Sequence, residues 1–513
     1  MRLFAMAALT LAAVATTGCS KDDEHIESTG KVVVSTTTVS LTDGNKALNS
    51  QGEKTFSTGD EVAVVYENTS DELVKTTVTL AEANISNGGK TASITVSMTA
   101  PKSGGTVKII YPAAMATDAG AVNYAALANQ DGKLTTIARS LDLALYEGSL
   151  NDTELPDIPT LDNPLAVCEF QIKNTTGSTD LTPSITMLYI ADGTNSYYLS
   201  GLSDLSSIWV VMKPVASSAT LTFHAAAGTT RYEKEISGKT LAAGNMYHVA
   251  VGTTQLRQGA LFGTFSVSGT KKVHFSQGNL KYTNGTWSFH TNQYDYMGGT
   301  SHDVSESGST DLFGWVGASS TWTGVKQYGV ATEGEDALNK EDGYGNVAIE
   351  TLKANWGTLA ISNGGNTTNS GWHTLTGGNS ESAEWNYLFN KRSSALSKYG
   401  SATVCGIVGT VVLPDNWTLP GGCSFASGMG GWDHNSYDAT TWPKMEAAGA
   451  VFLPAAGYRE GTSVIYVEDY GNYWSSSVGD ENAAGSVFFD GNRLRVGNYD
   501  DRFYGQSVRL VCE

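Results

Sequence analysis

The sequence predicts a mainly β protein, and three observations support this fold class. Short runs such as Thr91–Met98 alternate apolar and polar residues with the period of two expected for strands. Clusters such as Asn87-Gly88-Gly89 separate these runs and have the residues of tight turns. Charged residues make up only 16% of the chain and 57 of its 513 residues are Gly, a composition typical of extracellular β proteins. At roughly 150 residues per domain, this length predicts about three domains.

The net charge argues against two classes of partner. At pH 7 the formal net charge is −19. Nucleic-acid phosphates require a basic surface patch, so the sequence predicts no nucleic-acid partner. The same negative charge opposes electrostatic adhesion to anionic lipid.

The N-terminus predicts a targeting segment over residues 1–18. Arg2 supplies a positive start, and the apolar stretch Leu3–Ala15 is too short to span a bilayer. The segment Thr16–Cys19 resembles a lipoprotein cleavage box, although Thr16 stands where Leu is usual. Ser20–Glu24 looks like the acidic tag that sends Bacteroidetes lipoproteins to the outer cell surface. We therefore expect Cys19 to be lipidated, residues 19–30 to form a tether, and the protein to be anchored in the outer membrane. An ordinary signal peptide is the alternative.

Residues 31–162 predict a first β-sandwich. Its expected strands are separated by turn residues, at a spacing that suits two packed antiparallel sheets. The stretch from about Ala114 to Asp162 has a weaker period, with a short helix expected near Tyr124–Ala128. The strands are expected at Val32–Val39, Glu61–Tyr66, Thr91–Met98 and Val107–Tyr111.

Residues 163–253 predict a second sandwich with the same style of strand and turn. Cys168 falls in one of its strands and is expected to be a small core residue. The strands are expected at Leu165–Ile172, Ile185–Ile190, Ile208–Met212, Thr220–His224 and Met246–Val251.

Several segments of these two regions resemble landmarks of the fimbrillin-like surface lipoproteins of Bacteroidetes. The segment Leu241–Val249 is similar to the L-x-x-G-x-x-Y-x-V ending of their second domain. The other segments are Phe56–Val64, Ile110–Pro112 and Leu188–Asp192. The resemblance covers about residues 31–253. It implies two tandem β-sandwiches that belong to, or derive from, a pilus subunit.

After a linker at 254–260, residues 261–513 predict a third domain of different character. Ten of the eleven Trp residues of the chain lie here, which indicates a separate aromatic core. Ser382–Phe389 predicts a helix that Ser380 or Ser382 can cap, with Glu384 in its first turn. Trp442–Gly449 predicts a second helix. Strands are expected at Val404–Pro414 and Ala450–Tyr458.

This third region resembles the C-type-lectin-fold domain shared by formylglycine-generating enzymes and their non-enzymatic relatives. The similar segments keep their order over about 240 residues. They are Phe275–Tyr282, Ala383–Phe389, Leu413–Trp417, Gly449–Arg459, Tyr473–Ser477 and Gly505–Val511. Among these relatives, Bacteroides proteins diversified by diversity-generating retroelements are the most similar. The resemblance implies an α+β lectin-fold domain in which residues 470–509 form the variable region.

Within that region, the residue pattern predicts a binding surface on the last hairpin. Val487, Phe489, Leu494 and Val496 keep the period of strands with one face on a core. The outward side chains are aromatic residues, Arg and Asn, which is the composition of a binding surface. A terminal hairpin with a few exposed rings is the alternative. The predicted ligand-binding residues are Ser486, Phe488, Asp490, Arg493, Arg495, Asn498, Tyr499, Asp500, Asp501, Phe503, Tyr504 and Gln506, with Asp480 and Glu481 at the rim.

No segment predicts catalytic or metal chemistry. Cys405 and Cys423 are the only candidates for the paired thiols of an oxidase, and no neighbouring basic residue would activate them. A disulfide among Cys168, Cys405, Cys423 and Cys512 cannot be assigned from sequence. The segment Trp432–Asn435 is read as a polar loop rather than a metal cluster. We therefore expect no cofactor, no metal and no enzymatic activity.

Together these features predict a surface lipoprotein adhesin, at a pilus tip or free on the cell surface. The alternative is a structural pilus subunit, followed by a formylglycine-generating-type oxidase. The expected partners are an unknown protein or glycan on another cell or phage, other pilus subunits, and the outer membrane through the lipid anchor.

Overall fold

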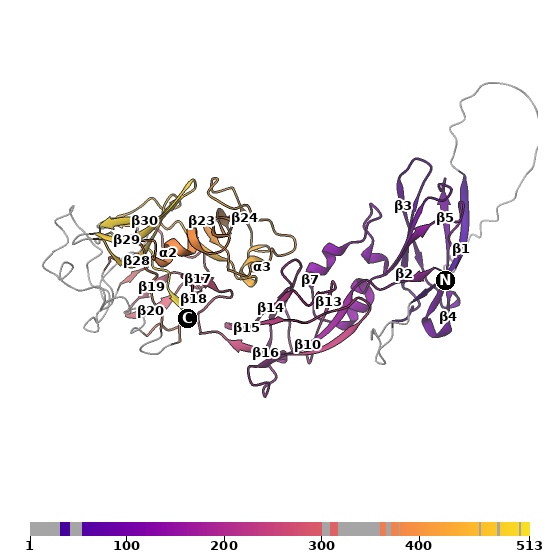
Figure 1. Ribbon diagram of the computed structural model, residues 1–513, viewed down its shortest axis with the longest axis horizontal. Helices are drawn as coiled ribbons and strands as arrows, with labels where there is room; N and C mark the ends of the chain where they lie inside the picture. The colour runs from indigo at the N-terminus through magenta and orange to yellow at the C-terminus, as the bar shows by residue number, and fades with distance from the viewer. Residues whose placement is uncertain are drawn as a thin grey trace, which may run out of the picture.

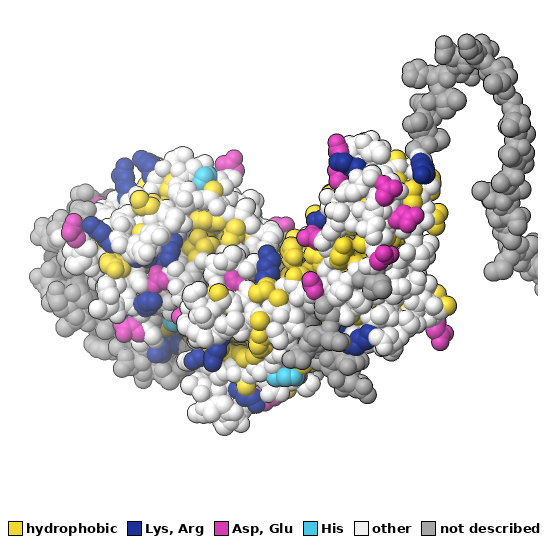
Figure 2. Space-filling model, turned by 45° about the vertical axis from the view of Figure 1, so that its right-hand side comes forward, with side chains coloured by type: hydrophobic (Ala, Val, Ile, Leu, Met, Phe, Trp, Pro, Cys, Tyr) yellow, Lys and Arg dark blue, Asp and Glu magenta, His cyan; other side chains and the backbone are white. Residues whose placement is uncertain are grey.

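The protein is mainly β, as the sequence predicted, and its sheets form three successive groups (Figure 1). The computed structural model describes residues 31–41, 54–157, 159–299, 308–315, 360–365, 371–378, 380–460, 463–479, 483–501 and 504–513. The predicted signal peptide, Cys19 and the tether lie outside these residues. No helix within the described ranges is long and apolar enough to cross a membrane. Figure 2 shows acidic and basic side chains scattered over one face of the molecule.

The first group is a pair of four-stranded sheets around a shared core. Val39 and Ile94 from one sheet pack with Val64 and Ile109 from the other. One sheet has the order β4 (Ile85–Ser86), β5 (Thr91–Thr99), β1 (Val32–Leu41), β9 (Thr160–Leu161). The other has the order β3 (Leu73–Thr79), β2 (Glu61–Glu67), β6 (Thr106–Tyr111), β8 (Ala144–Ser149).

The second group is an eight-stranded sheet that folds back on itself. Phe170 and Phe223 contact edge to face at 5.4 Å, although two strands lie between theirs in the sheet. The long strand β16 makes this turn, since it pairs with β10 along most of its length and with β15 at its end. The order is β13 (Ile208–Met212), β10 (Ala166–Asn174), β16 (Met246–Gln255), β15 (Thr230–Ser237), β14 (Thr220–Ala227), β11 (Met187–Ala191), β12 (Ser196–Ser200), β7 (Asn129–Gln130).

The first two groups share a core, which differs from the sequence-based boundary between residues 162 and 163. Strand β2 is buried on both faces, and its Ala63 and Val65 pack into the core of the second group. Met115, Leu127 and Ile137 belong to that same core, and the short helix α1 (Leu134–Thr136), which has no buried residue, directly precedes Ile137. The segment assigned to the first sandwich from sequence therefore packs between the two.

The third group contains short sheets around several aromatic clusters and two short helices, α2 (Glu384–Asn386) and α3 (Trp442–Ala447). Strand β31 near the C-terminus pairs with β18, which joins the two ends of this region. Two three-stranded sheets have the orders β17 (Phe265–Ser266), β18 (Lys272–Phe275), β31 (Val511–Cys512) and β20 (Thr286–Phe289), β19 (Leu280–Thr283), β21 (Ser309–Thr310). A four-stranded sheet has the order β24 (Ser436–Tyr437), β22 (Tyr399–Val404), β23 (Ile407–Val412), β25 (Val451–Pro454). The last two sheets are the pair β26 (Tyr458–Glu460), β27 (Ser463–Ile465) and the three strands β28 (Gly471–Val478), β29 (Ala483–Asp490), β30 (Arg493–Asp501).

Two local predictions in this region were wrong. Neither Ser380 nor Ser382 caps α2, because Ala383 is the N-cap residue and the Glu384 amide donates to Thr376 Oγ1 instead, at 2.9 Å. The expected strand Val404–Pro414 is interrupted at its start. Cys405 and Gly406 have φ angles of 50° and 87° and form the turn between β22 and β23.

His224 lies at the contact between the second and third groups. Its side chain is buried, its Nδ1 lies 2.7 Å from the Ala447 carbonyl oxygen, and its ring stacks on Phe262 at 4.8 Å. Burial lowers the pKa of His224 to about 4. The folded protein therefore binds a proton at His224 more weakly than the unfolded chain does. The contribution of neutral His224 to the free energy of unfolding is complete above the ordinary pKa of about 6.5 and is lost as the pH falls toward 4.

We predict that His224 makes the contact acid-sensitive, with a loss of about 3 kcal/mol between pH 6.5 and 4. Glu233 at the same contact acts in the opposite direction, since burial raises its pKa to about 7. The measurement is urea unfolding of wild type and His224→Phe between pH 7 and 4.5. The variant keeps an aromatic ring but cannot titrate, so its stability should fall less steeply. Equal slopes for the two proteins would contradict the prediction.

Candidate ligand-binding site

The sheet β28–β29–β30 positions the predicted binding residues. Strands β29 and β30 form a hairpin whose turn is held by Asp490. The Asp490 carboxylate accepts hydrogen bonds from the Asn492 backbone amide at 2.8 Å and from Arg493 Nε at 2.7 Å. Val487 and Phe489 are fully buried, while Leu494 and Val496 are partly buried against the same core. One face of the hairpin therefore lies on the core, as its alternating pattern predicted.

A β-bulge decides which side chains share the opposite face. Ser486 pairs with Asn498, whereas Phe488 pairs with Arg495, so β30 contains one extra residue between these pairs. The bulge moves Asn498 onto the face that carries Phe488 and Arg495. Since side chains alternate along a strand, Asp500 follows on the same face.

This face forms one side of a pocket of about 320 Å³. That volume is at the small end of the range for small-molecule sites. The lining residues come from the last hairpin, from the segments on either side of β27, and from the chain after β30. They are Tyr458, Tyr470, Asn472, Phe488, Arg493, Arg495, Asn498, Asp500, Tyr504 and Gln506.

Asp500 organises the polar floor of this pocket. Its Oδ2 accepts hydrogen bonds from Ser486 Oγ at 2.6 Å, Gln506 Nε2 at 2.7 Å and Asn498 Nδ2 at 2.9 Å. Ser486 and Gln506 are buried, so these bonds satisfy donors that water cannot reach. The carboxylate thus fixes the orientation of its neighbours before any ligand arrives.

Two amide atoms of the floor have no hydrogen-bond partner among the described residues. They are Asn472 Nδ2 and Gln506 Oε1, on side chains that are 5% and 1% exposed. Asp500 holds the Gln506 Nε2, so the amide oxygen must point away from that carboxylate. A buried polar atom without a partner costs roughly 1–3 kcal/mol. The floor therefore keeps one donor and one acceptor unused.

A continuous arc of five aromatic rings borders the pocket. Tyr504 meets Tyr458 edge to face at 5.0 Å, and Tyr458 stacks on Tyr466 at 5.8 Å. Tyr466 stacks on Tyr470 at 4.4 Å, and Tyr470 meets Phe488 edge to face at 5.1 Å. Each ring is held by its neighbour, so the arc can contact a ligand with little loss of side-chain entropy.

Two arginines extend this arc over the outer face of Phe488. The guanidinium carbons of Arg493 and Arg495 lie 5.7 and 5.9 Å from the ring centroid, within cation–π range. Arg493 is paired with Asp490, and that bond raises its pKa. Arg495 is exposed and forms no ion pair within the part of the chain that the structure describes.

The structure divides the predicted binding residues into four groups, of which Tyr499 and Asp501 form the last. Seven of them line the pocket: Phe488, Arg493, Arg495, Asn498, Asp500, Tyr504 and Gln506. Ser486 is buried beneath the floor and Asp490 holds the hairpin turn, so each supports a lining residue rather than facing a ligand. Asp480, Glu481 and Phe503 lie outside the described residues.

Tyr499 and Asp501 do not join this surface. They pair with Gly485 and Ala483, which belong to the core-facing side of β29. The Tyr499 ring packs over Gly378, where any side chain would collide with the Tyr499 hydroxyl, and it remains 41% exposed at the sheet end. A single patch containing both Tyr499 and Tyr504 is therefore wrong, because Tyr499 lies on the core-facing side of β30 whereas Tyr504, which follows the strand, lines the pocket.

The sequence prediction missed Tyr458, Tyr470 and Asn472. These residues reach the pocket through contacts of Gly457 with Gly471 and of Arg459 with Gly505, which link segments distant in sequence. The Tyr-rich composition of residues 458–470 was the one signal available, since Tyr is common in binding surfaces.

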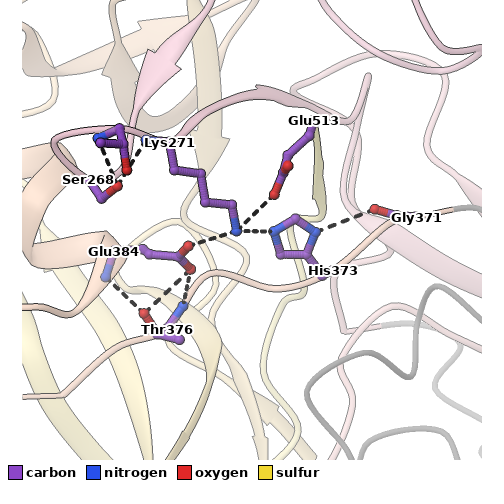
Figure 3. Close-up of polar contacts among 8 residues, drawn as sticks. Ser268, Lys271, Gly371, His373, Thr376, Glu384 and Glu513 are labelled. Carbon is purple, nitrogen blue, oxygen red and sulfur yellow. Dashed lines mark hydrogen bonds and ion pairs between the residues drawn. The ribbon is translucent and has the colours of Figure 1, made fainter.

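The polar cluster around Lys271 has the residue types of a catalytic site but a structural arrangement (Figure 3). Lys271 Nζ lies 2.9 Å from Glu384 Oε1, 3.1 Å from His373 Nε2 and 3.3 Å from Glu513 Oε1. Burial opposes its charge, but the bonds to the two glutamates outweigh burial and raise its pKa. Glu384 also accepts the Thr376 amide at 2.9 Å. Through Lys271, which directly precedes β18, the cluster connects this strand with α2 and with the last residue. This structural role accounts for the position of Glu384 without a catalytic function.

The two candidate thiols have the wrong properties for an oxidase. Cys405 lies in a hairpin turn, and Cys423 lies in a loop. Burial raises the pKa of both thiols, which favours the unreactive protonated form. None of the disulfides considered from sequence is formed among the four cysteines that the structure describes.

The segment Trp432–Asn435 is a structural loop. Asn435 is buried and bonds the backbone at Ser401 and Ala426, while the His434 ring contacts the Ser427 carbonyl oxygen. Across the described ranges, no group of three or more His, Cys, Asp or Glu side chains could hold a metal ion.

Comparisons with known proteins identify only distant likenesses. No protein family and no curated protein matches the sequence. A fimbrial assembly protein from Parabacteroides distasonis is 12% identical, with 48% of this chain and 97% of that chain covered and a TM-score of 0.25. A fimbrial protein from Bacteroides ovatus is 10% identical, with 93% and 99% covered and a TM-score of 0.24. The tip fimbrial protein Mfa3 from Porphyromonas gingivalis is 9% identical, with 44% and 99% covered and a TM-score of 0.22. Likeness at these scores carries no argument about function.

Proposed function

We propose that this protein is a cell-surface adhesin that binds a ligand through the pocket beside the last hairpin. The observation that supports the proposal is the pocket itself. It brings together a preformed aromatic arc, two buried amide atoms and Arg495; the amide atoms have no hydrogen-bond partner, and Arg495 no ion-pair partner, among the described residues. Buried polar atoms without partners are rare, and a ligand that satisfies them recovers their cost.

The test is a binding screen of the chain from Ser20 to Glu513. The protein is applied to arrays of glycans and of surface proteins, beside the variant Phe488→Ala as a matched sample. Phe488 is half-buried on the pocket face, so its truncation should remove binding while the fold survives. Ligands bound equally by the two proteins would reject the pocket as the binding site.

We further infer that the third region is a C-type-lectin-fold domain whose residues 470–509 are diversified by a retroelement. The pocket supports this inference, because most of its lining side chains project from strands whose backbone is fixed by pairing. The observation that tests it is the neighbouring DNA. A reverse-transcriptase gene and a near-copy of the codons for residues 470–509, differing at adenines, are expected. Their absence would remove the diversification proposal and leave the pocket unaffected.

Anchoring through a lipid on Cys19 remains a prediction from the cleavage box. We expect wild-type protein to incorporate a radioactive fatty acid and to fractionate with the outer membrane. Cys19→Ala should incorporate none, because the acylated thiol is absent. A matched Ser20→Ala variant should be labelled normally. Continued labelling of Cys19→Ala would show that another residue carries the lipid or that the segment is an ordinary signal peptide.

The position of the protein on the cell has two competing interpretations. An adhesin at a pilus tip, or free on the surface, suits the large third region that follows the two fimbrillin-like regions, since a stalk subunit needs both ends free to exchange strands. A structural stalk subunit is the second candidate. Immunogold labelling along whole fibres would favour the stalk, and labelling confined to tips or the envelope would favour the adhesin.

A further inference from the structure

We propose that the pocket binds an acidic saccharide, whose ring hydroxyls face the polar floor and whose carboxylate or sulfate lies on Arg495. The inference rests on the proposed ligand-binding function and names the chemical class of the ligand. Three features of the pocket carry it: the unused hydrogen-bonding atoms, the aromatic arc and the different states of the two arginines.

The floor requires a ligand that donates and accepts hydrogen bonds at neighbouring positions. Asn472 Nδ2 needs an acceptor and Gln506 Oε1 needs a donor. A hydroxyl group serves as either, so adjacent hydroxyls of a sugar ring can satisfy both atoms. Both atoms have almost no solvent exposure, so the proposal requires the amide groups or their neighbours to rotate when a ligand binds.

The arc supplies the complementary apolar contact. A pyranose ring has a face of C–H groups that packs on aromatic rings, while its hydroxyls point outward along the edge. Tyr458, Tyr504 and Phe488 lie beside the amides of the floor in the same pocket. The aromatic wall of the pocket can contact the C–H face of a sugar ring, and the polar floor can bond its hydroxyls. The pocket therefore complements both kinds of surface that a sugar ring has.

The two arginines predict where a negative group would bind. Arg493 is already neutralised by Asp490 through its Nε and terminal nitrogens. Arg495 has its cation over the Phe488 ring and no carboxylate partner among the described residues. A carboxylate or sulfate on the ligand can make a charge-assisted bond to Arg495, and it gains less from Arg493.

Asp500 determines the orientation of the ligand. Its carboxylate occupies the floor and repels an anionic group placed there, although three donors share its Oδ2. The neutral hydroxyls must therefore face the floor while the acidic group stays at the rim beside Arg495. A neutral saccharide would satisfy the floor alone and leave Arg495 unused.

An acidic peptide is the competing ligand, and the floor disfavours it. An apolar peptide side chain can pair with neither unused atom of the floor, and an ionised acidic side chain can accept from Asn472 Nδ2 but cannot donate to Gln506 Oε1. Here Asn472, Asn498, Asp500 and Gln506 make the deepest part polar. A peptide could use Arg495, but its side chains would cover these amides without satisfying both unused atoms.

The experiment compares three sugars that differ only at carbon 6. Methyl β-D-glucoside, its 6-sulfate and methyl β-D-glucuronide are titrated by NMR into the chain from Ser20 to Glu513 at low ionic strength. We expect both acidic sugars to bind about tenfold more tightly than the glucoside, a typical value for one charge-assisted contact. Tighter binding of only one of them identifies which acidic group fits.

The variants Arg495→Gln and Arg493→Gln form a matched pair. Arg495→Gln should abolish the preference for acidic sugars over the glucoside, whereas Arg493→Gln should keep most of that preference. Both residues are exposed, and unchanged melting temperatures would establish that the variants fold. Equal losses from the two variants would overturn the assignment of Arg495.

Failure of this inference is distinguishable from failure of the proposed function. Equal binding of all three sugars, or binding of none, overturns the acidic saccharide. Capture of an acidic peptide instead of sugars also overturns it. If an array ligand is nevertheless lost in Phe488→Ala, the pocket remains a binding site for another class of molecule.

Discussion

Phe489→Ala is expected to unfold the third region at physiological temperature. The Phe489 side chain is fully buried, stacks on Tyr473 at 5.9 Å and meets Trp432 edge to face at 6.5 Å. Truncation of such a ring leaves a cavity and costs about 3–5 kcal/mol. A domain is stable by only about 5–15 kcal/mol, so this loss is a large share of the total. Urea unfolding followed by Trp fluorescence measures it.

The neighbouring Phe488→Ala is the control for this prediction. Phe488 has the same chemistry but lies on the pocket face and is only half-buried. We expect its truncation to cost less than about 1.5 kcal/mol, because solvent can fill the space that the ring leaves. Equal destabilisation by the two variants would mean that both faces of the hairpin are core, and the pocket would be wrongly assigned.

Tyr504→Ala should remove most of the binding while leaving the fold intact. Tyr504 lines the pocket and ends the aromatic arc through its contact with Tyr458. An aromatic residue at the centre of a binding surface contributes about 2 kcal/mol or more, which corresponds to about thirtyfold in affinity. The ring is partly exposed, so its loss should change the melting temperature by only a few degrees.

The alternating pattern of the sequence was sufficient to predict the hairpin and its core face. Val487 and Phe489 recur at every second position and are fully buried. The same pattern could not predict the extra residue in β30. The structure continues β30 to Asp501, beyond Val496, the last residue of the alternating apolar pattern. That continuation places Tyr499 and Asp500 on opposite faces.

The residues that complete the pocket could not be found from local pattern, because they depend on tertiary contacts. Asn472 faces the pocket because β28 pairs with β29, which sets Asn472 opposite Phe488. Tyr458 joins because its neighbour Arg459 pairs with Gly505 across 46 residues of sequence. The spacing of residues along the sequence does not indicate such long-range contacts.

The contact between the first two regions likewise depends on tertiary structure. Strand β2 is apolar at successive positions, which is typical of strands buried on both faces. We interpreted Glu61–Tyr66 as part of one sandwich, whereas its two faces serve two cores. The second core that β2 contacts depends on the fold of residues 113–143. The hydrophobic periodicity of these residues is weak, so the sequence does not indicate this contact.

The most direct test of the central claim is the affinity of Tyr504→Ala compared with Tyr499→Ala. Isothermal titration with a ligand from the array screen, together with thermal melting of each variant, provides both measurements. The two tyrosines lie five residues apart, and only Tyr504 lines the pocket. We predict about a thirtyfold loss of affinity for Tyr504→Ala and a change of less than about twofold for Tyr499→Ala. Unchanged affinity in a folded Tyr504→Ala variant would contradict this prediction.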